Sequence, residues 1–246
     1  MEVHRVLLDG EDAPVPAYEA VPADRRGGII VVHEAFGLTD YIRGVCAALA
    51  EDGFHAIAPN LFHRHGIDAI SYDDLNKAKD VMAQLAADQI RADIRSAVQR
   101  LGAAGLTDRS VGILGFCMGG SIACAVATEQ AFGAAVTFYG AGIRQGRFGF
   151  APLADRVPLL RTPWLGLYGD RDTTIPVADI EFLRSEAARA PVPTAVVRYP
   201  EAGHGFHCSA RPAHFHQPSA ADAWERTRDW FNRYLNPAGL PTGPAG

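Results

Sequence analysis

Cysteine is scarce in this 246-residue sequence, and no two cysteines form a C-x-x-C pair. The absence of that pair argues against a dithiol redox motif and against a cysteine-type zinc site. In a reducing compartment, we expect all of the cysteines to be free thiols. They are Cys46, Cys117, Cys124 and Cys208.

Positive charge is also in deficit, with 23 Lys and Arg against 28 Asp and Glu and a formal net charge of −5. Without a dense basic run, this balance argues against a nucleic-acid partner. No apolar stretch reaches the roughly 18 residues that a membrane span requires. Residues 1–14 lack the basic and apolar regions of a signal peptide, so we expect a cytoplasmic protein without membrane association.

Apolar residues make up 48% of the chain and charged residues 21%, which is typical of a soluble protein with a substantial core. The length fits one large α/β domain over residues 1–246, as a monomer or homodimer. Residues 237–246 are rich in Pro and Gly, and we expect them to form a frayed tail.

Strand-like and helix-like segments alternate along most of the chain. Residues 2–8 and 16–21 predict a β-hairpin. The helix predicted over 40–52 has Asp40 as its expected N-cap, and residues 71–101 predict one helix or two, with a weak stretch at Asp88–Gln89. Further strands are predicted at 27–33, 54–60, 110–115, 134–140, 164–169 and 194–200, and further helices after Cys117 and at 177–190 and 219–235. This alternation predicts an α/β fold with a mainly parallel central sheet and helices on both faces.

The sequence Gly115-Phe116-Cys117-Met118-Gly119 fits a G-x-nucleophile-x-G turn between a predicted strand and a predicted helix. Such a turn holds its nucleophile in a strained conformation at the carboxyl end of the sheet. The helix N-terminus supplies partial positive charge and free N–H groups, which favour a thiolate and an oxyanion. Taken alone, the same pattern also fits a Gly-rich packing turn with a buried Cys.

An acid and a histidine follow later predicted strands. Asp170 and Asp172 come after the strand at 164–169, and His204 comes after the strand at 194–200. The order nucleophile, acid, histidine is that of α/β-hydrolases. Two acids compete for the third place; we assign Asp172 to it and expect Asp170 to cap the turn.

The chain thereby resembles the dienelactone hydrolase family of the α/β-hydrolases over about 230 residues, nearly its whole length. The motifs that carry the resemblance are residues 33–37 (HEAFG), the turn around Cys117, the loop with Asp172, and residues 202–206 (AGHGF). The resemblance implies the α/β-hydrolase fold, a small-molecule ester or lactone substrate, and no metal or organic cofactor. It also implies a Cys117–His204–Asp172 triad, Glu34 beside the thiol, and backbone N–H groups of Ala35 and Met118 as oxyanion donors. Independently, a carboxylate such as Glu34 at the end of a buried strand is costly unless a thiol or an Arg partners it.

The chain departs from the family pattern where two arginines bind the carboxylate of dienelactone. The position four residues after the histidine is Cys208, and the helix-rich stretch before the nucleophile offers only Lys77 or Lys79 as a point charge. We therefore expect an uncharged or bulkier ester, lactone or thioester as the natural substrate.

Other residues carry weaker hypotheses. Phe36, Tyr139 and Phe206 are candidates for an apolar substrate pocket. We expect His63 and His65 to be solvated loop residues, Arg144 and Arg147 to be surface charges, and the pair His214 and His216 to be a poor metal motif. Two other functions stay open: a thiol redox sensor that uses Cys117, with Cys208 as the only candidate resolving cysteine, and a non-catalytic binding protein.

Overall fold

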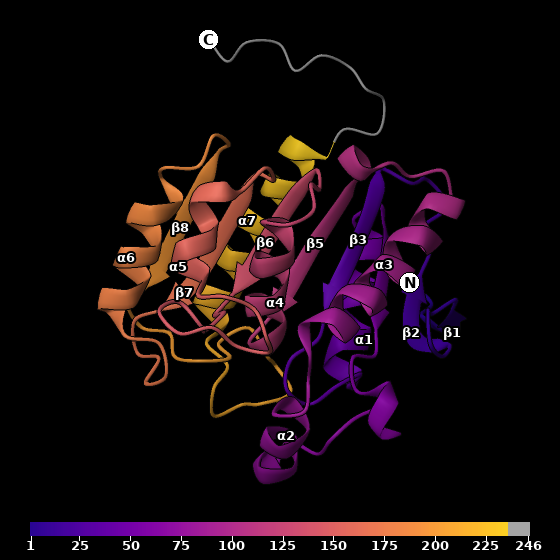
Figure 1. Cartoon of the computed structure of the whole chain (residues 1–246), viewed down its shortest axis with the longest axis horizontal. Coiled ribbons are helices and arrows are strands. Elements are labelled where there is room, and N and C mark those ends of the chain that lie inside the picture. The colour runs from indigo at the N-terminus through magenta and orange to yellow at the C-terminus, as the bar shows by residue number, and fades with distance from the viewer. Residues whose placement is uncertain (236–246) are drawn as a thin grey trace.

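A computed structural model describes residues 1–235, and its centre is one eight-stranded sheet (Figure 1). The strand order is β1-β2-β4-β3-β5-β6-β7-β8. The strands are β1 (His4–Leu8), β2 (Val15–Ala20), β3 (Gly27–Val32), β4 (Phe54–Pro59), β5 (Val111–Phe116), β6 (Ala134–Phe138), β7 (Trp164–Gly169) and β8 (Thr194–Tyr199). β1, β2 and β4 pair antiparallel, and all other neighbours pair parallel. The predicted hairpin and the mainly parallel sheet are therefore confirmed.

Helices cover both faces of the sheet, as predicted. The helices are α1 (Asp40–Glu51), α2 (Leu75–Met82), α3 (Ala87–Ala103), α4 (Met118–Ala127), α5 (Leu153–Arg156), α6 (Val177–Ala187) and α7 (Gln217–Tyr234). Consecutive strand residues point to opposite faces. A side chain at Gly27 would meet Leu235, just beyond α7, whereas one at Gly28 would meet Leu101 of α3. The helices α7 and α3 thus lie on opposite faces; α1 shares the face of α7, because residues of both line one groove.

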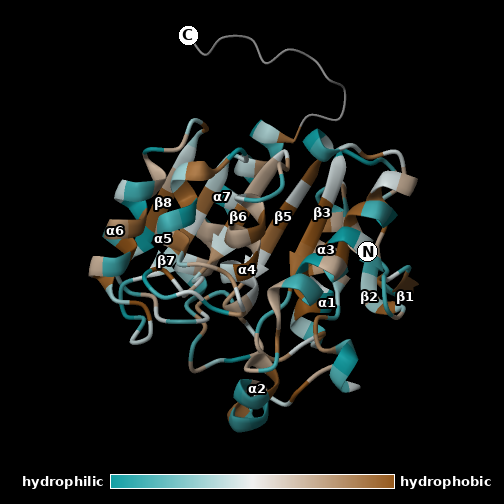
Figure 2. Ribbon diagram, in the orientation of Figure 1, coloured by the Kyte–Doolittle hydropathy of each residue, from teal (hydrophilic) through white to brown (hydrophobic). Residues whose placement is uncertain are grey.

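Hydrophobic strands form the core between these layers (Figure 2). Every residue of β3, β4, β5, β6 and β7 is buried. In β3 the run of four β-branched residues, Ile29–Val32, packs against helices on both sides, which is the pattern of an interior parallel strand.

Two details of the predicted helices were wrong. The N-cap of α1 is Thr39, whose Oγ1 accepts from the N–H of Ile42, so Asp40 is the first helical residue. The segment 71–101 forms two helices, but the break falls at 83–86, because Ala86 takes an extended conformation; Asp88–Gln89 lie inside the first turn of α3. The short helix α5 was not predicted at all. The predicted tail, 237–246, lies outside the described residues.

The parallel arrangement brings six strand ends to one edge of the sheet. β3, β4, β5, β6, β7 and β8 all run the same way, so the loops that follow them meet there. Glu34, Cys117, Tyr139, Asp172 and His204 come directly after these strands or within five residues of them.

No helix in residues 1–235 is both long enough and apolar enough to cross a membrane.

Candidate active site

Cys117 occupies a strained turn between β5 and α4. Its φ of 54° and ψ of −115° lie in a region that non-glycine residues rarely adopt. Its N–H donates to the carbonyl of Phe138 at 3.0 Å, which ties the turn to the end of β6. The turn is tight, because a Cβ at Gly115 would collide with the carbonyl of Gly119, and one at Gly119 with the carbonyl of Val32. The two glycines therefore let the start of α4 lie against the end of β3.

The structure brings Cys117, His204 and Asp172 into one chain of contacts. His204 Nε2 lies 3.0 Å from Cys117 Sγ, and His204 Nδ1 lies 2.6 Å from Asp172 Oδ2. The other oxygen of Asp172 accepts from the hydroxyl of Thr174 at 2.7 Å and from its N–H at 2.8 Å. Both carboxylate oxygens are thereby held, which fixes the direction in which Asp172 meets the imidazole. The competing acid, Asp170, makes a two-armed ion pair with Arg198 instead.

These contacts also set the charges. Burial favours the neutral imidazole, but the electrostatic and hydrogen-bond interactions with Cys117 and Asp172 outweigh it and raise the pKa of His204 to about 10. Burial likewise opposes ionisation of Asp172, yet hydrogen bonds from His204 and Thr174 hold the pKa of that carboxyl below its usual value. These contacts therefore favour the protonated, positively charged form of His204.

Two backbone N–H groups beside the thiol are free to bind an anion. Met118 is the first residue of α4, so its N–H has no acceptor within the helix. Ala35 follows β3, and within residues 1–235 its N–H has no hydrogen-bond acceptor either. These are the two donors that the family resemblance implies.

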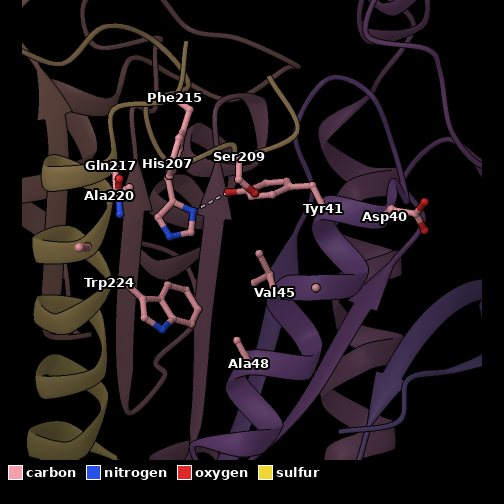
Figure 3. Close-up of a pocket in the computed structure, with 12 residues that line it drawn as sticks. Asp40, Tyr41, Val45, Ala48, His207, Ser209, Phe215, Gln217, Ala220 and Trp224 are labelled. Carbon is pink, nitrogen blue, oxygen red and sulfur yellow. Dashed lines mark hydrogen bonds between the residues drawn. The ribbon is translucent and has the colours of Figure 1, made fainter. Parts of the chain in front are cut away.

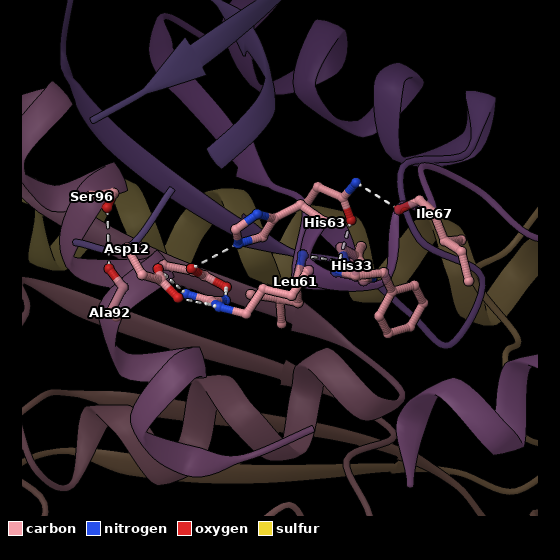
Figure 4. Close-up of polar contacts among 11 residues, drawn as sticks. Asp12, His33, Leu61, His63, Ile67, Ala92 and Ser96 are labelled. Carbon is pink, nitrogen blue, oxygen red and sulfur yellow. Dashed lines mark hydrogen bonds and ion pairs between the residues drawn. The ribbon is translucent and has the colours of Figure 1, made fainter. Parts of the chain in front are cut away.

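A buried histidine fixes the loop that carries Ala35 (Figure 4). The N–H of Leu61 donates to His33 Nε2 at 3.0 Å, so that nitrogen carries no proton. His33 Nδ1 therefore carries the proton and donates it to the carbonyl of Glu34 at 2.7 Å. Burial lowers the pKa of His33 to about 4, so the ring is neutral at physiological pH. The role of this residue was not predicted.

Glu34 lies in a buried polar cluster of its own. Cys208 Sγ lies 3.8 Å from Glu34 Oε1 and 3.6 Å from the hydroxyl of Tyr72. Burial raises the pKa of Glu34, against the opposing effects of Tyr72 and the positive charge of Arg211. Burial also raises the pKa of Cys208 to about 12. Glu34 therefore has a thiol as a partner, as expected, but this thiol is that of Cys208 and not that of Cys117.

Arg211 brings a cation to this cluster that sequence reasoning missed. Its guanidinium lies over the rings of Phe36 and Tyr72, 5.3 and 5.9 Å from their centroids. Its polar partner is the imidazole of His214 at 2.9 Å. A positive charge therefore lies close to Glu34 and Cys208, although position 208 itself is not Arg.

The three predicted pocket residues are buried. Tyr139 and Phe206 have no exposed surface, and their rings pack on each other at 5.3 Å. Tyr139 also packs on His204 at 5.1 Å, and Phe36 packs on Tyr72 at 4.7 Å. Tyr139 therefore packs directly on the imidazole and Phe206 packs on Tyr139, while the role of both in binding a substrate stays a prediction.

The prediction that His63 is solvated was wrong. Its side chain is only 5% exposed, and Nε2 lies 3.2 Å from the buried carboxylate of Asp93 (Figure 4). Arg64 joins the same carboxylate at 2.8 Å and also pairs with Asp12. This network ties the loop after β4 to α3. The burial of Asp93 is the feature that the sequence did not reveal.

The remaining predictions concern charged and metal-binding groups. Arg144 pairs with Asp179 at 2.5 Å and stacks on Phe182. Across the described part of the chain, no three His, Cys, Asp or Glu side chains gather as metal ligands.

Comparison with known proteins reveals close similarity along nearly the whole chain. The model of the "Dienelactone hydrolase family" matches residues 15–235. A "Putative carboxymethylenebutenolidase" of Methylorubrum extorquens is 38% identical over 242 residues, covering 93% of this chain and 80% of that protein. The "Carboxymethylenebutenolidase" of Rhodococcus opacus is 30% identical and covers 90% of this chain and 87% of its own. A crystal structure of a "Putative Dienelactone Hydrolase" from Klebsiella pneumoniae superposes with a TM-score of 0.84 at 32% identity, covering 95% and 99% of the two chains.

Proposed function

The chain belongs to the dienelactone hydrolase family, with the α/β-hydrolase fold, and we propose that it cleaves its ester or lactone substrates through an acyl-enzyme on Cys117. The observation that carries the proposal is the run of short contacts from Cys117 Sγ through His204 to Asp172. A nucleophile, a base and an orienting acid in this geometry are what acyl transfer requires.

In the first half of the reaction, the Cys117 thiolate attacks the substrate carbonyl carbon, and a carbon–sulfur bond forms. The carbonyl electron pair moves onto oxygen, where the N–H groups of Ala35 and Met118 stabilise it by about 3 kcal/mol per donor. When the tetrahedral intermediate collapses, the bond to the leaving oxygen breaks. The imidazolium of His204 gives that oxygen its proton. An ester thereby releases an alcohol, whereas an opened lactone keeps its enol as part of the acyl chain bound to Cys117.

In the second half, neutral His204 takes a proton from water, and the hydroxide adds to the thioester carbonyl. Collapse of this second intermediate breaks the carbon–sulfur bond and releases the acid. The thiolate and the imidazolium are regenerated together. Asp172 stabilises the imidazolium at both stages, and Thr174 holds Asp172 in place.

The choice of substrate depends on the cluster around Glu34. The name of the relatives indicates a butenolide with a carboxymethylene group, which is an anion at neutral pH. Arg211 gives this chain a cation close to Glu34 and Cys208, so a carboxylate-bearing lactone and an uncharged aryl ester both belong in the assay.

The experiment is hydrolysis of a panel of small aryl esters, thioesters and dienelactone by the wild type, Cys117→Ala and Cys124→Ala. Cys124 lies on the same helix and is fully buried, which makes it the matched control. We expect Cys117→Ala to lose at least 10³-fold in kcat and Cys124→Ala to stay within a few-fold of the wild type. Unchanged turnover in Cys117→Ala would refute the proposal. No turnover by the wild type on any substrate would favour the thiol-sensor alternative.

A further inference from the structure

A groove of about 500 Å³ lies between α1 and α7, on the face of the sheet opposite α3 (Figure 3). Tyr41, Val45 and Ala48 of α1 form one wall. Ala220 and Trp224 of α7 form the other. The volume is within the range of small-molecule sites, and most of the lining is apolar. Cys117, Asp172 and His204 do not line it, so it is separate from the candidate active site.

One polar side chain in the groove, that of His207, has a hydrogen-bond partner for only one of its two ring nitrogens. The imidazole of His207 lies between the two walls, and its Nδ1 is 2.7 Å from the hydroxyl of Tyr41. Within residues 1–235, Nε2 has no hydrogen-bond partner. Burial lowers the pKa of His207 to about 4, so the ring is neutral at pH 7. The His207 side chain is only partly buried and lines the groove, so a ligand in the groove can reach this nitrogen.

Aromatic side chains beside His207 suit a flat ligand, because Trp224 and Phe215 both line the groove. The His207 ring packs against Trp224 at 5.3 Å and is held from the core side by buried Phe116 at 5.4 Å. Gly44 and Ala48 leave room beside these rings, and a Cβ added at Gly44 would meet nothing within 4 Å.

The charge of the groove excludes one class of ligand. Its lining contains no Lys or Arg, and its one charged residue is the exposed carboxylate of Asp40. An anion entering the groove would therefore gain no cationic partner and would lose part of its hydration.

We propose that this groove binds a neutral aromatic small molecule whose hydroxyl group pairs with His207 Nε2. A phenolic hydroxyl both donates and accepts, so it suits either tautomer of the imidazole. The site is independent of the acyl-transfer chemistry proposed above.

The probe is 2-naphthol, with binding measured by calorimetry at pH 7 on the full chain. Gly44→Leu fills the groove from α1, and we expect it to weaken binding at least tenfold. Gly102→Leu is the matched control, because Gly102 is an exposed helical glycine on α3 whose added Cβ also meets nothing. We expect its affinity to stay within twofold of the wild type. Equal affinities of the wild type and Gly44→Leu would overturn the proposal.

Two further measurements test separately the hydrogen bond to His207 and the exclusion of anions from the groove. His207→Phe keeps the ring but removes Nε2, and we expect about tenfold weaker binding of 2-naphthol. The anion 2-naphthoate should bind the wild type at least tenfold more weakly than 2-naphthol, and equal binding of the two would contradict the charge argument.

Alkylation of Cys117 with iodoacetamide distinguishes the two sites. Unchanged 2-naphthol binding after alkylation supports the groove, whereas its loss would place the ligand at the thiol and overturn the proposal. A different result would also overturn the proposal. If the wild type does not bind 2-naphthol but forms a dimer, and Gly44→Leu is a monomer, the groove is the contact surface for a second copy of the chain.

Discussion

Replacing His33 by Gln tests whether a neutral buried imidazole holds the loop of Ala35. The side chain of His33 has no exposed surface, and its pKa falls from an ordinary 6.5 to about 4. Between these values the unfolded chain binds a proton that the folded chain does not bind. The free energy of unfolding therefore falls as the pH drops through this window. At 1.36 kcal/mol per pKa unit, the free energy of unfolding falls by about 3 kcal/mol in all. About 2 kcal/mol of this fall is reached by pH 5.

The assay is urea unfolding of the wild type and His33→Gln at pH 7.5, 6.5, 5.5 and 5.0. His207, whose pKa is also lowered, is present in both proteins, so its contribution cancels in the difference. At pH 7.5, His33→Gln should have a lower free energy of unfolding than the wild type, because the Gln amide fits the two backbone partners less well. Between pH 7.5 and pH 5, however, the free energy of unfolding of the variant should fall by about 2 kcal/mol less than that of the wild type. His4→Gln is the control, because the His4 side chain is 58% exposed, and its pH dependence should match the wild type.

Parallel stability curves for the wild type and His33→Gln would refute this reasoning. They would mean that His33 binds its proton in the folded protein as readily as in the unfolded chain. The inferred tautomer, with Nε2 accepting from Leu61, would then be wrong as well.

Four other predictions follow from the described contacts. Glu34→Ala should lower kcat at least tenfold but leave the melting temperature within a few degrees, because a buried carboxyl with a raised pKa stabilises the fold little; wild-type turnover would contradict this. Thr174→Val removes the hydroxyl that orients Asp172 and should lower kcat about tenfold, whereas the exposed neighbour variant Thr173→Val should not; equal rates would show that the N–H of residue 174 suffices. Arg211→Gln should lower kcat/KM for dienelactone about tenfold and leave that for p-nitrophenyl acetate within twofold; an equal loss on both would make Arg211 a structural residue. Thr39→Ala removes the N-cap of α1 and should cost about 1 kcal/mol in urea unfolding; no change would mean that the 3.5 Å cap bond contributes nothing.

The sheet and the place of the site follow from local patterns in the sequence. Runs such as Ile29–Val32 are apolar at every position, so they identify interior strands without any knowledge of their neighbours. The turn around Cys117 needs its flanking glycines for purely local steric reasons, which makes that turn recognisable. The order of nucleophile, acid and histidine then predicts a common edge, because the strands that carry them run parallel.

The contacts that could not be predicted depend on pairs far apart in the chain. His63 and Asp93 are 30 residues apart, and only the packing of the loop after β4 on α3 shows that both are buried. Arg211 reaches Phe36 and Tyr72 across more than 130 residues, so family spacing alone, which led to position 208, missed it. Thr174 lies two residues after Asp172 and could have been suggested by local Asx-turn chemistry.

The central claim is that Cys117 carries the acyl group, and the most direct test is to trap that group. Wild-type protein is mixed with p-nitrophenyl acetate, quenched in acid within the first turnover, digested and mapped by mass spectrometry. We expect one acetyl group on the peptide that contains Cys117, as a thioester that hydroxylamine removes. Full turnover with no acetyl on Cys117, or an acetyl group on another residue such as Cys208, would contradict the account.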